Sequence, residues 1–127
     1  MALGKEFRVM GKFRFQDLNI WQLAIEIGET LFDLADILEQ KKLFRFAEQL
    51  GASGMSVSNN IAEGSGSYSK AEFRNFLNIA RRSVFENANI LIILNRRKLL
   101  SGNELNNLLE QLDLLSRKIT SFRNSIN

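Results

Sequence analysis

The sequence predicts an all-α fold, an up-down-up-down antiparallel four-helix bundle. The 127 residues contain no proline and are rich in leucine, glutamate, lysine and arginine, which favours long uninterrupted helices. Apolar residues recur every three or four positions over four stretches, which are separated by short polar connections. Such short connections force consecutive helices to run antiparallel, and we expect a single domain over residues 1–127.

Residues 1–16 form a basic, aromatic arm ahead of the first helix. Its cations give a local charge of +3 against the one acid Glu6, and they alternate with aromatic rings: Lys5, Arg8, Lys12 and Arg14, with Phe7, Phe13 and Phe15. Such a segment resembles an arm that stacks on bases and pairs with phosphates. The more common use is to anchor a chain terminus to the bundle, and both interpretations stay open.

The first helix is predicted over about residues 17–40. One apolar stripe consists of Leu18, Trp21, Ile25, Gly28, Phe32 and Ala35, and a second of Ala24, Ile27, Leu31, Leu34 and Leu38. A face this wide is expected to contact two neighbouring helices or a second subunit. The same stretch holds six acids and no base, for a local charge of −6.

The second helix, over about residues 43–63, is expected to bury Leu43, Phe46, Leu50, Val57 and Ile61. Its middle, GASGMSVSNN, has low helix propensity, so tertiary packing must compensate. Close approach of another helix across Gly51, Ser53, Gly54 and Ser58 would do so, and enlarging Gly54 is then expected to be destabilising.

The third helix is predicted over about residues 70–98, after a turn in which Ala62, Glu63 and Gly64 close the second helix. Ser69 and Glu72 form a capping box at its start, and the cations Arg96, Arg97 and Lys98 suit its C-terminal dipole. Its buried face consists of Phe73, Leu77, Ala80, Val84, Asn87, Leu91 and Leu94. The preceding GSGS lacks the lysine and strand of a phosphate-binding loop, so a flexible turn is predicted.

The fourth helix is predicted over about residues 103–124, opened by a second capping box at Ser101 and Glu104. Its apolar residues keep heptad spacing: Leu105, Leu108, Leu112, Leu115, Ile119, Phe122 and Ile126. Among all four helices, Trp21, Phe46, Phe73 and Leu112 are the expected anchors of the core, where truncation to alanine would cost about 2–5 kcal/mol.

The composition argues against catalysis. The chain has no cysteine and no histidine, so it lacks a thiol nucleophile, an imidazole base and the ligands of a di-iron site, and we expect neither a metal nor a cofactor. Glu63 and Glu86 could act as acids or bases only if buried. We instead interpret Asn60, Glu63, Gly64 and Glu86 as a structural polar motif, in which Glu63 bonds backbone or Asn60 and Glu86 pairs with arginine or asparagine.

A basic stripe is expected on the third helix, where Lys70, Arg74 and Arg81 share one face and Arg82 lies beside them. Such a stripe could bind phosphates in a salt-dependent manner. The alternative is pairing with the acidic first helix of the same or a neighbouring subunit.

The residues also resemble a known family, the ribosomal RNA intervening-sequence proteins, over about residues 13–126. The resemblance lies in the DLxxWQ head of the first helix, in the run Asn60-Ile61-Ala62-Glu63-Gly64, and in Glu72, Phe73, Phe76, Leu77, Ile79, Ala80, Ser83 and Glu86. Members are encoded in insertions of bacterial large-subunit ribosomal RNA genes and elsewhere. The resemblance implies a left-handed bundle that forms a ring-like homopentamer. It also implies similarity to the accessory protein of diversity-generating retroelements, which binds nucleic acid and a reverse transcriptase. Some positions differ from the family pattern. Gly51 and Ala52 stand where many members have arginines, and Arg82 stands where members usually have glycine.

We therefore expect a non-enzymatic, cytoplasmic homo-oligomer that binds RNA or a ribonucleoprotein, with no membrane span and no small-molecule substrate. The nucleic-acid contacts are predicted to be Lys70, Arg74, Arg81, Arg82, Arg8, Lys12 and Arg14. Reversal of Arg74 and Arg81 to glutamate is expected to abolish RNA retention. The alternative is a homo-oligomeric scaffold that binds a protein partner without nucleic-acid affinity, in which case the same reversals would dissociate the oligomer.

Overall fold

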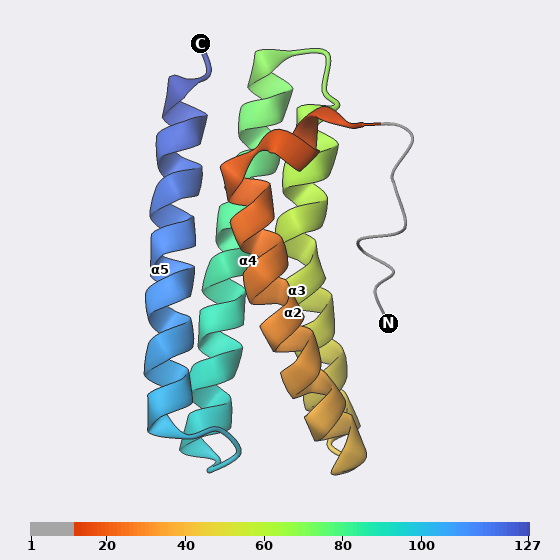
Figure 1. The fold of residues 1–127 in the computed structure, drawn as a ribbon, viewed down its shortest axis with the longest axis vertical. Helices are drawn as coiled ribbons and strands as arrows, with labels where there is room; N and C mark the ends of the chain where they lie inside the picture. Colours follow the sequence, from red (N-terminus) through yellow and green to blue (C-terminus); the bar gives the residue numbers. More distant parts are fainter. Residues whose placement is uncertain (1–11) are drawn as a thin grey trace.

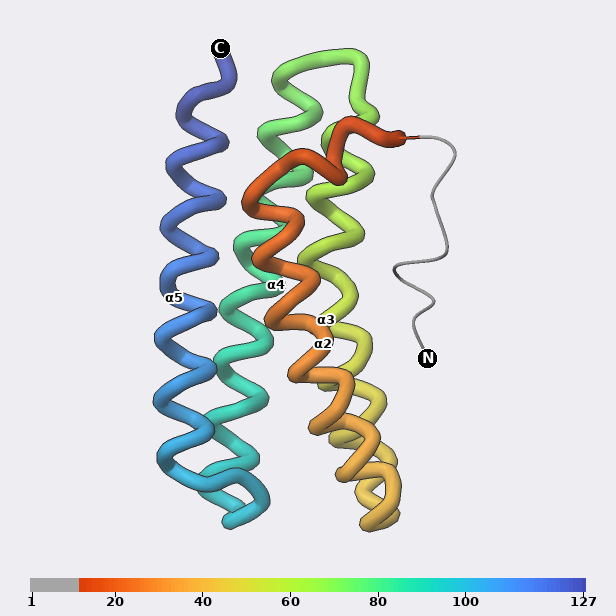
Figure 2. Tube along the Cα trace, in the orientation of Figure 1, coloured from red at the N-terminus to blue at the C-terminus, as the bar shows by residue number. Residues whose placement is uncertain are grey.

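The computed structural model describes residues 12–127, which form a four-helix bundle (Figure 1). A short 3₁₀ helix, η1 (Arg14–Asp17), leads into α2 (Asn19–Gln40), α3 (Phe44–Ser65), α4 (Lys70–Arg96) and α5 (Gly102–Ser125). Consecutive helices run in opposite directions, as the tube in Figure 2 shows. This part of the chain contains no strand. The predicted all-α, up-down topology is confirmed, with helix ends within a few residues of the expected positions.

Each helix packs on its neighbours in sequence, and α2 also packs on α5, which closes the bundle. The backbones of the diagonal pairs, α2 with α4 and α3 with α5, do not approach each other closely. α2 and α5 approach where α2 begins and diverge toward its C-terminus (Figure 1). Two neighbours within the chain thus cover the second apolar stripe of α2, whereas much of the first stripe stays partly exposed.

The core is built from the second stripe of α2 and from single faces of the other helices. Ala24, Ile27, Leu31, Leu34 and Leu38 are all buried. Most of the first stripe, including Trp21 and Phe32, is only half-buried. Of the four expected anchors, Phe73 and Leu112 are buried, whereas Trp21 and Phe46 are half-buried at the edge of the core.

The glycines of α3 play different roles from those expected. A Cβ on Gly28 of α2 would lie 3.7 Å from the Gly54 carbonyl oxygen, so the two backbones do approach here. A Cβ on Gly54 would lie 3.4 Å from Leu31 Cδ1, which is an ordinary contact distance. Alanine therefore fits at Gly54, and only larger side chains are excluded. Gly51 faces open space, so no helix approaches it.

Gly64 does not close α3, contrary to prediction. It lies inside the helix, which continues to Ser65 and is capped by Gly66. A Cβ on Gly64 would lie 2.7 Å from Phe76 Cβ and 2.9 Å from Phe73 Cδ1, both on α4. Gly64 is required because α3 and α4 pack too closely at this point for a side chain.

Both predicted serine caps are present. The Ser69 Oγ accepts a hydrogen bond from the Glu72 amide at 3.0 Å, and the Ser101 Oγ accepts one from the Glu104 amide at 3.1 Å. Each hydroxyl satisfies one of the free amides of a helix N-terminus. These caps fix where α4 and α5 begin.

The α2–α3 and α4–α5 turns have the same construction. Lys42 and Lys98 each adopt a left-handed backbone conformation with φ of 63°. Leu43 N donates to the Leu38 carbonyl, and Leu99 N donates to the Leu94 carbonyl, each at 2.9 Å. Both turns are therefore Schellman motifs, in which the left-handed position usually holds glycine.

Candidate nucleic-acid interface

A polar network joins α3 to α4 beside the Gly64 contact. Asn60 Nδ2 donates to the Ser56 carbonyl at 2.7 Å and to Ser56 Oγ at 3.1 Å. Ser56 Oγ lies 2.8 Å from Ser83 Oγ on α4. Ser56, Asn60 and Gly64 are four residues apart and so share the face of α3 that packs on α4.

The structure corrects the interpretation of Glu63 and Glu86. Both side chains are exposed, and neither has a hydrogen bond or ion pair within residues 12–127. Glu63 precedes Gly64 by one position and therefore does not share the helix face on which Asn60 and Gly64 lie. Its side chain is exposed outside the α3–α4 contact. Ser56 and Ser83 complete the network instead, and the four-residue spacing of Ser56 and Asn60 was the signal for it.

Neither a metal-binding cluster nor a membrane-spanning helix is seen in the described part of the chain. Residues 12–127 contain no group of three or more carboxylate, imidazole or thiol side chains placed to hold a metal ion. No helix among these residues is both long and apolar enough to cross a lipid bilayer.

The described end of the arm is anchored to the bundle. The Phe15 ring lies 5.0 Å from the Trp21 ring, between centroids, and the Gln16 carbonyl accepts a hydrogen bond from Gln22 Nε2 at 2.8 Å. These contacts hold η1 across one end of the bundle (Figure 1) and fix the position of Arg14. Arg8 lies outside the described residues.

This anchoring brings two predicted cations together. Arg14 of η1 and Lys70 of α4 line one pocket of about 470 Å³ at the end of the bundle where α3 connects to α4. The Arg14 guanidinium carbon lies 5.2 Å from the centroid of the Phe73 ring, which also lines the pocket. The rest of the lining consists of Ser67, Tyr68, Ser69, Phe122, Ser125, Ile126 and Asn127. We call this the loop-end pocket.

The side chains of the loop-end pocket suit an anionic, ring-containing ligand. Tyr68 is fully exposed, at 107% of the reference area. Ser67 Oγ is buried and has no hydrogen-bond partner within the described chain. Two cations and an exposed tyrosine with its hydroxyl group are the groups that contact phosphates and bases.

Two other predicted cations are engaged in the fold. Arg74 is half-buried, and its Nη1 donates to the Ile126 carbonyl at 3.0 Å, which ties the end of α5 to α4. Lys12 Nζ lies 3.0 Å from Asp17 Oδ1 in an exposed ion pair. Arg74 therefore has a structural role that the sequence pattern did not indicate.

Arg81 and Arg82 are exposed further along α4. The Arg81 guanidinium carbon lies 4.8 Å from the Phe85 ring centroid, and Phe85 is itself 55% exposed. No ion pair within residues 12–127 joins the cations of α4 to the acids of α2. Pairing of these helices within one chain is excluded for the described residues, because α2 and α4 are diagonal in the bundle.

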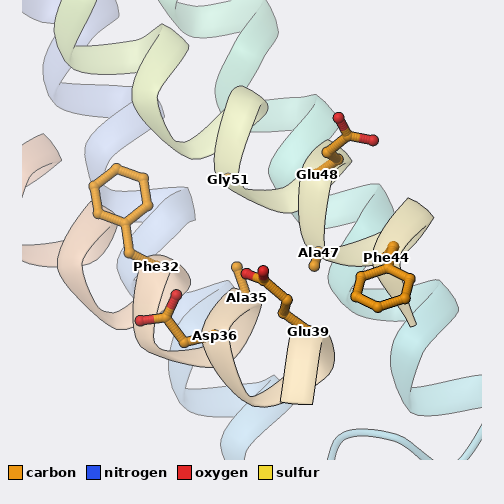
Figure 3. A pocket seen from close by; sticks show the side chains of 8 residues that line it. All are labelled: Phe32, Ala35, Asp36, Glu39, Phe44, Ala47, Glu48 and Gly51. Atoms are coloured by element: carbon orange, nitrogen blue, oxygen red, sulfur yellow. The ribbon is translucent and has the colours of Figure 1, made fainter. Parts of the chain in front are cut away.

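An acidic groove of about 580 Å³ lies between α2 and α3 (Figure 3). Asp36 and Glu39 of α2 and Glu48 of α3 supply three carboxylates, and Phe32 and Phe44 supply aromatic walls. Small residues form the rest of the lining: Ala35, Ala47 and Gly51. The sequence predicted an acidic helix, but the contribution of Phe44 and Glu48 was missed because it depends on how α3 packs. A cationic partner would fit this groove.

Comparisons with known proteins place the bundle among characterised folds. The family model of the 23S rRNA-intervening sequence protein matches residues 16–121. Among curated proteins, none matches the chain. A crystal structure of a protein of unknown function from the S23 ribosomal protein family of Bacteroides thetaiotaomicron VPI-5482 is similar with a TM-score of 0.77. The similarity covers 82% of this chain and 97% of that one at 23% identity, so it shows the shared fold.

Proposed function

The chain belongs to the 23S rRNA-intervening sequence protein family, and we propose that it is a non-enzymatic, cytoplasmic homo-oligomer that binds RNA or a ribonucleoprotein. The resemblance drawn from the Asn60–Gly64 run is thereby confirmed. The observation that carries the proposal is the loop-end pocket, in which Arg14 from the arm and Lys70 from α4 converge beside an exposed Tyr68. Homopentamer formation is proposed from the family similarity.

The chemistry of the pocket favours RNA over a small metabolite. Phosphate contacts from arginine and lysine supply most of the affinity for nucleic acids, and an exposed aromatic ring adds stacking with any base. Arg81, Arg82 and Phe85 extend the same combination along α4. The proposed ligand is therefore a structured RNA contacted through its backbone and through an unpaired base.

The test compares the unmodified protein with an Arg14→Gln/Lys70→Gln double variant. Binding to a fluorescently labelled RNA hairpin is measured by anisotropy over a series of salt concentrations. We expect weaker binding and a salt dependence shallower by about 1.4–1.8 in log–log slope, from the loss of two phosphate contacts. Tyr68→Ala should also weaken binding while circular dichroism stays unchanged, because this ring is fully exposed. Unchanged affinity in both variants would contradict the proposal.

A second candidate is a homo-oligomeric scaffold for a protein partner, without nucleic-acid affinity. One supporting observation is the acidic groove, because a cationic face such as Arg81 and Arg82 of a neighbouring copy would complement it. The other is the set of exposed apolar side chains on α4, namely Phe85, Ile92 and Ile93. In that case Arg81→Glu/Arg82→Glu should dissociate the oligomer in light scattering without RNA. Arg74 is left unchanged in this test because it holds the end of α5.

A further inference from the structure

The end of the bundle opposite the loop-end pocket carries a second concentration of positive charge. Both tight turns lie there, the α2–α3 turn and the α4–α5 turn (Figure 1). Six exposed cations belong to these turns and the adjoining helix ends: Lys41, Lys42, Arg45, Arg96, Arg97 and Lys98. We call this set the turn-end cations. None of them forms an ion pair within residues 12–127.

Packing of α3 on α4 joins the two groups of cations into one surface. The Arg97 guanidinium carbon lies 6.0 Å from the centroid of the Phe46 ring, so the end of α4 meets the start of α3. Arg45 and Phe46 also line a pocket with Ile93 of α4. The acids in the same segments are fewer than the cations: Glu39, Glu48 and Glu104. The surface is therefore positive overall.

Lys42 and Lys98 occupy backbone positions that disfavour lysine. Each has φ of 63°, where a Cβ clashes with the local backbone and glycine is preferred. Cations near the C-termini of α2 and α4 are favourable for the helix dipole, but Lys41, Arg96 and Arg97 already supply them. Keeping a lysine at the left-handed position of both turns thus lowers fold stability while adding charge. Backbone strain of this kind points to a binding role.

We propose that the turn-end cations form a second contact site for the phosphate backbone of RNA. This inference rests on the proposed function and adds to it a site at the other end of the bundle. Arginine beside the ring of Phe46 is a combination that binds both phosphates and unpaired bases. An anionic membrane surface would meet the same cations, and vesicles are therefore included in the test.

The experiment uses three double variants that each remove two positive charges. Lys42→Gly/Lys98→Gly alters the turn-end cations, and Arg14→Gln/Lys70→Gln alters the loop-end pocket. Arg117→Gln/Lys118→Gln is the control on the exposed C-terminal half of α5, where Arg117 pairs with Asp113. The probe is the labelled RNA hairpin in a salt series, with thermal melting measured on each variant. For the turn variant we expect binding about tenfold weaker or more at low salt and a log–log salt slope shallower by about 1.4–1.8.

The glycine substitutions separate binding from folding. Because glycine is preferred at φ of 63°, the melting temperature of the turn variant should rise while its RNA affinity falls. Weaker binding can then not be ascribed to unfolding. Unchanged affinity in the turn variant overturns the proposal, whether or not the pocket variant loses affinity. Equal loss in the α5 control also overturns it, because only net charge would matter.

The same variants distinguish failure of this site from failure of the proposed function. Loss of affinity in the turn variant alone supports the turn-end site and rejects the loop-end pocket, and loss in the pocket variant alone does the reverse. Vesicles of phosphatidylglycerol and phosphatidylcholine provide the remaining test. Vesicle binding that depends on Lys42 and Lys98, with RNA affinity unaffected by them, would overturn the proposal in favour of a membrane surface.

Discussion

Gly64 is the residue whose side-chain space is most restricted among the described glycines. A methyl group there would lie 2.7 Å from Phe76 Cβ, which is attached to the backbone of α4 and cannot rotate away. We predict that Gly64→Ala lowers the free energy of unfolding by about 1–3 kcal/mol, because α3 and α4 must separate to admit it. Urea denaturation followed by circular dichroism measures this change.

Gly51→Ala is the matched control for Gly64→Ala. Gly51 also lies within α3, but a Cβ there meets nothing within 4 Å. The substitution should raise the free energy of unfolding by about 0.5–1 kcal/mol, because alanine has the higher helix propensity. Destabilisation by both substitutions would contradict the packing account of Gly64.

Arg74 is predicted to stabilise the bundle more than it contributes to RNA binding. Its guanidinium donates to the Ile126 carbonyl, so Arg74→Gln should lower the free energy of unfolding by about 1 kcal/mol. Amide hydrogen exchange in the last turn of α5 should become faster in the variant. An RNA affinity loss larger than that of Arg14→Gln/Lys70→Gln would contradict this assignment.

Residue roles were only partly predictable from the sequence. The asparagine of the Asn60–Gly64 run was correctly placed in a polar network, but its partners depend on which face of α3 meets α4. Ser56 and Ser83 lie on that face and Glu63 does not. Similarly, the contact between Arg74 and Ile126 joins the start of α4 to the chain end and has no local sequence signal.

The two tight turns give a prediction at the scale of elements. Lys42→Gly and Lys98→Gly should each raise the free energy of unfolding by about 1 kcal/mol, because each removes a Cβ from a left-handed position. The turns are far apart in sequence, so the two gains should be nearly additive in urea denaturation. A loss of stability in either variant would show that the lysine side chain stabilises its turn more than the backbone strain opposes it.

Helices with strong local signals were predicted most accurately. The serine caps of α4 and α5 act within one turn, so the sequence specifies them directly. The starts of α2 and α3 have no side-chain cap, and their N-cap residues are Leu18 and Leu43. These ends are set by packing, since both leucines contact the core. The glycine-rich and serine-rich middle of α3 likewise remains helical because its Ser53, Gly54, Val57 and Ser58 are buried in the bundle.

For the whole molecule, topology decides which charges act together. The sequence shows a basic arm, an acidic first helix and a basic third helix, and the structure describes both helices and, of the arm's cations, Lys12 and Arg14. Only the fold brings Arg14 to Lys70 at one end and the two lysine-containing turns to the other. The acidic groove lies between α2 and α3 and borders the turn end, where its Glu39 and Phe44 flank the α2–α3 turn.

This distribution predicts how assembly and RNA binding respond to salt. Light scattering of the purified protein should show a homo-oligomer, and addition of a structured ribosomal RNA fragment should increase the mass at low salt. At moderate salt the RNA should dissociate, because release of counterions from phosphates drives binding at both cationic ends.

The oligomer itself should persist if apolar side chains such as Phe85 and Ile92 lie in its interface, since their burial is insensitive to screening. A monomer at all salt concentrations would contradict self-association. Dissociation of the oligomer by salt would instead indicate that the acidic groove and a cationic face hold the copies together.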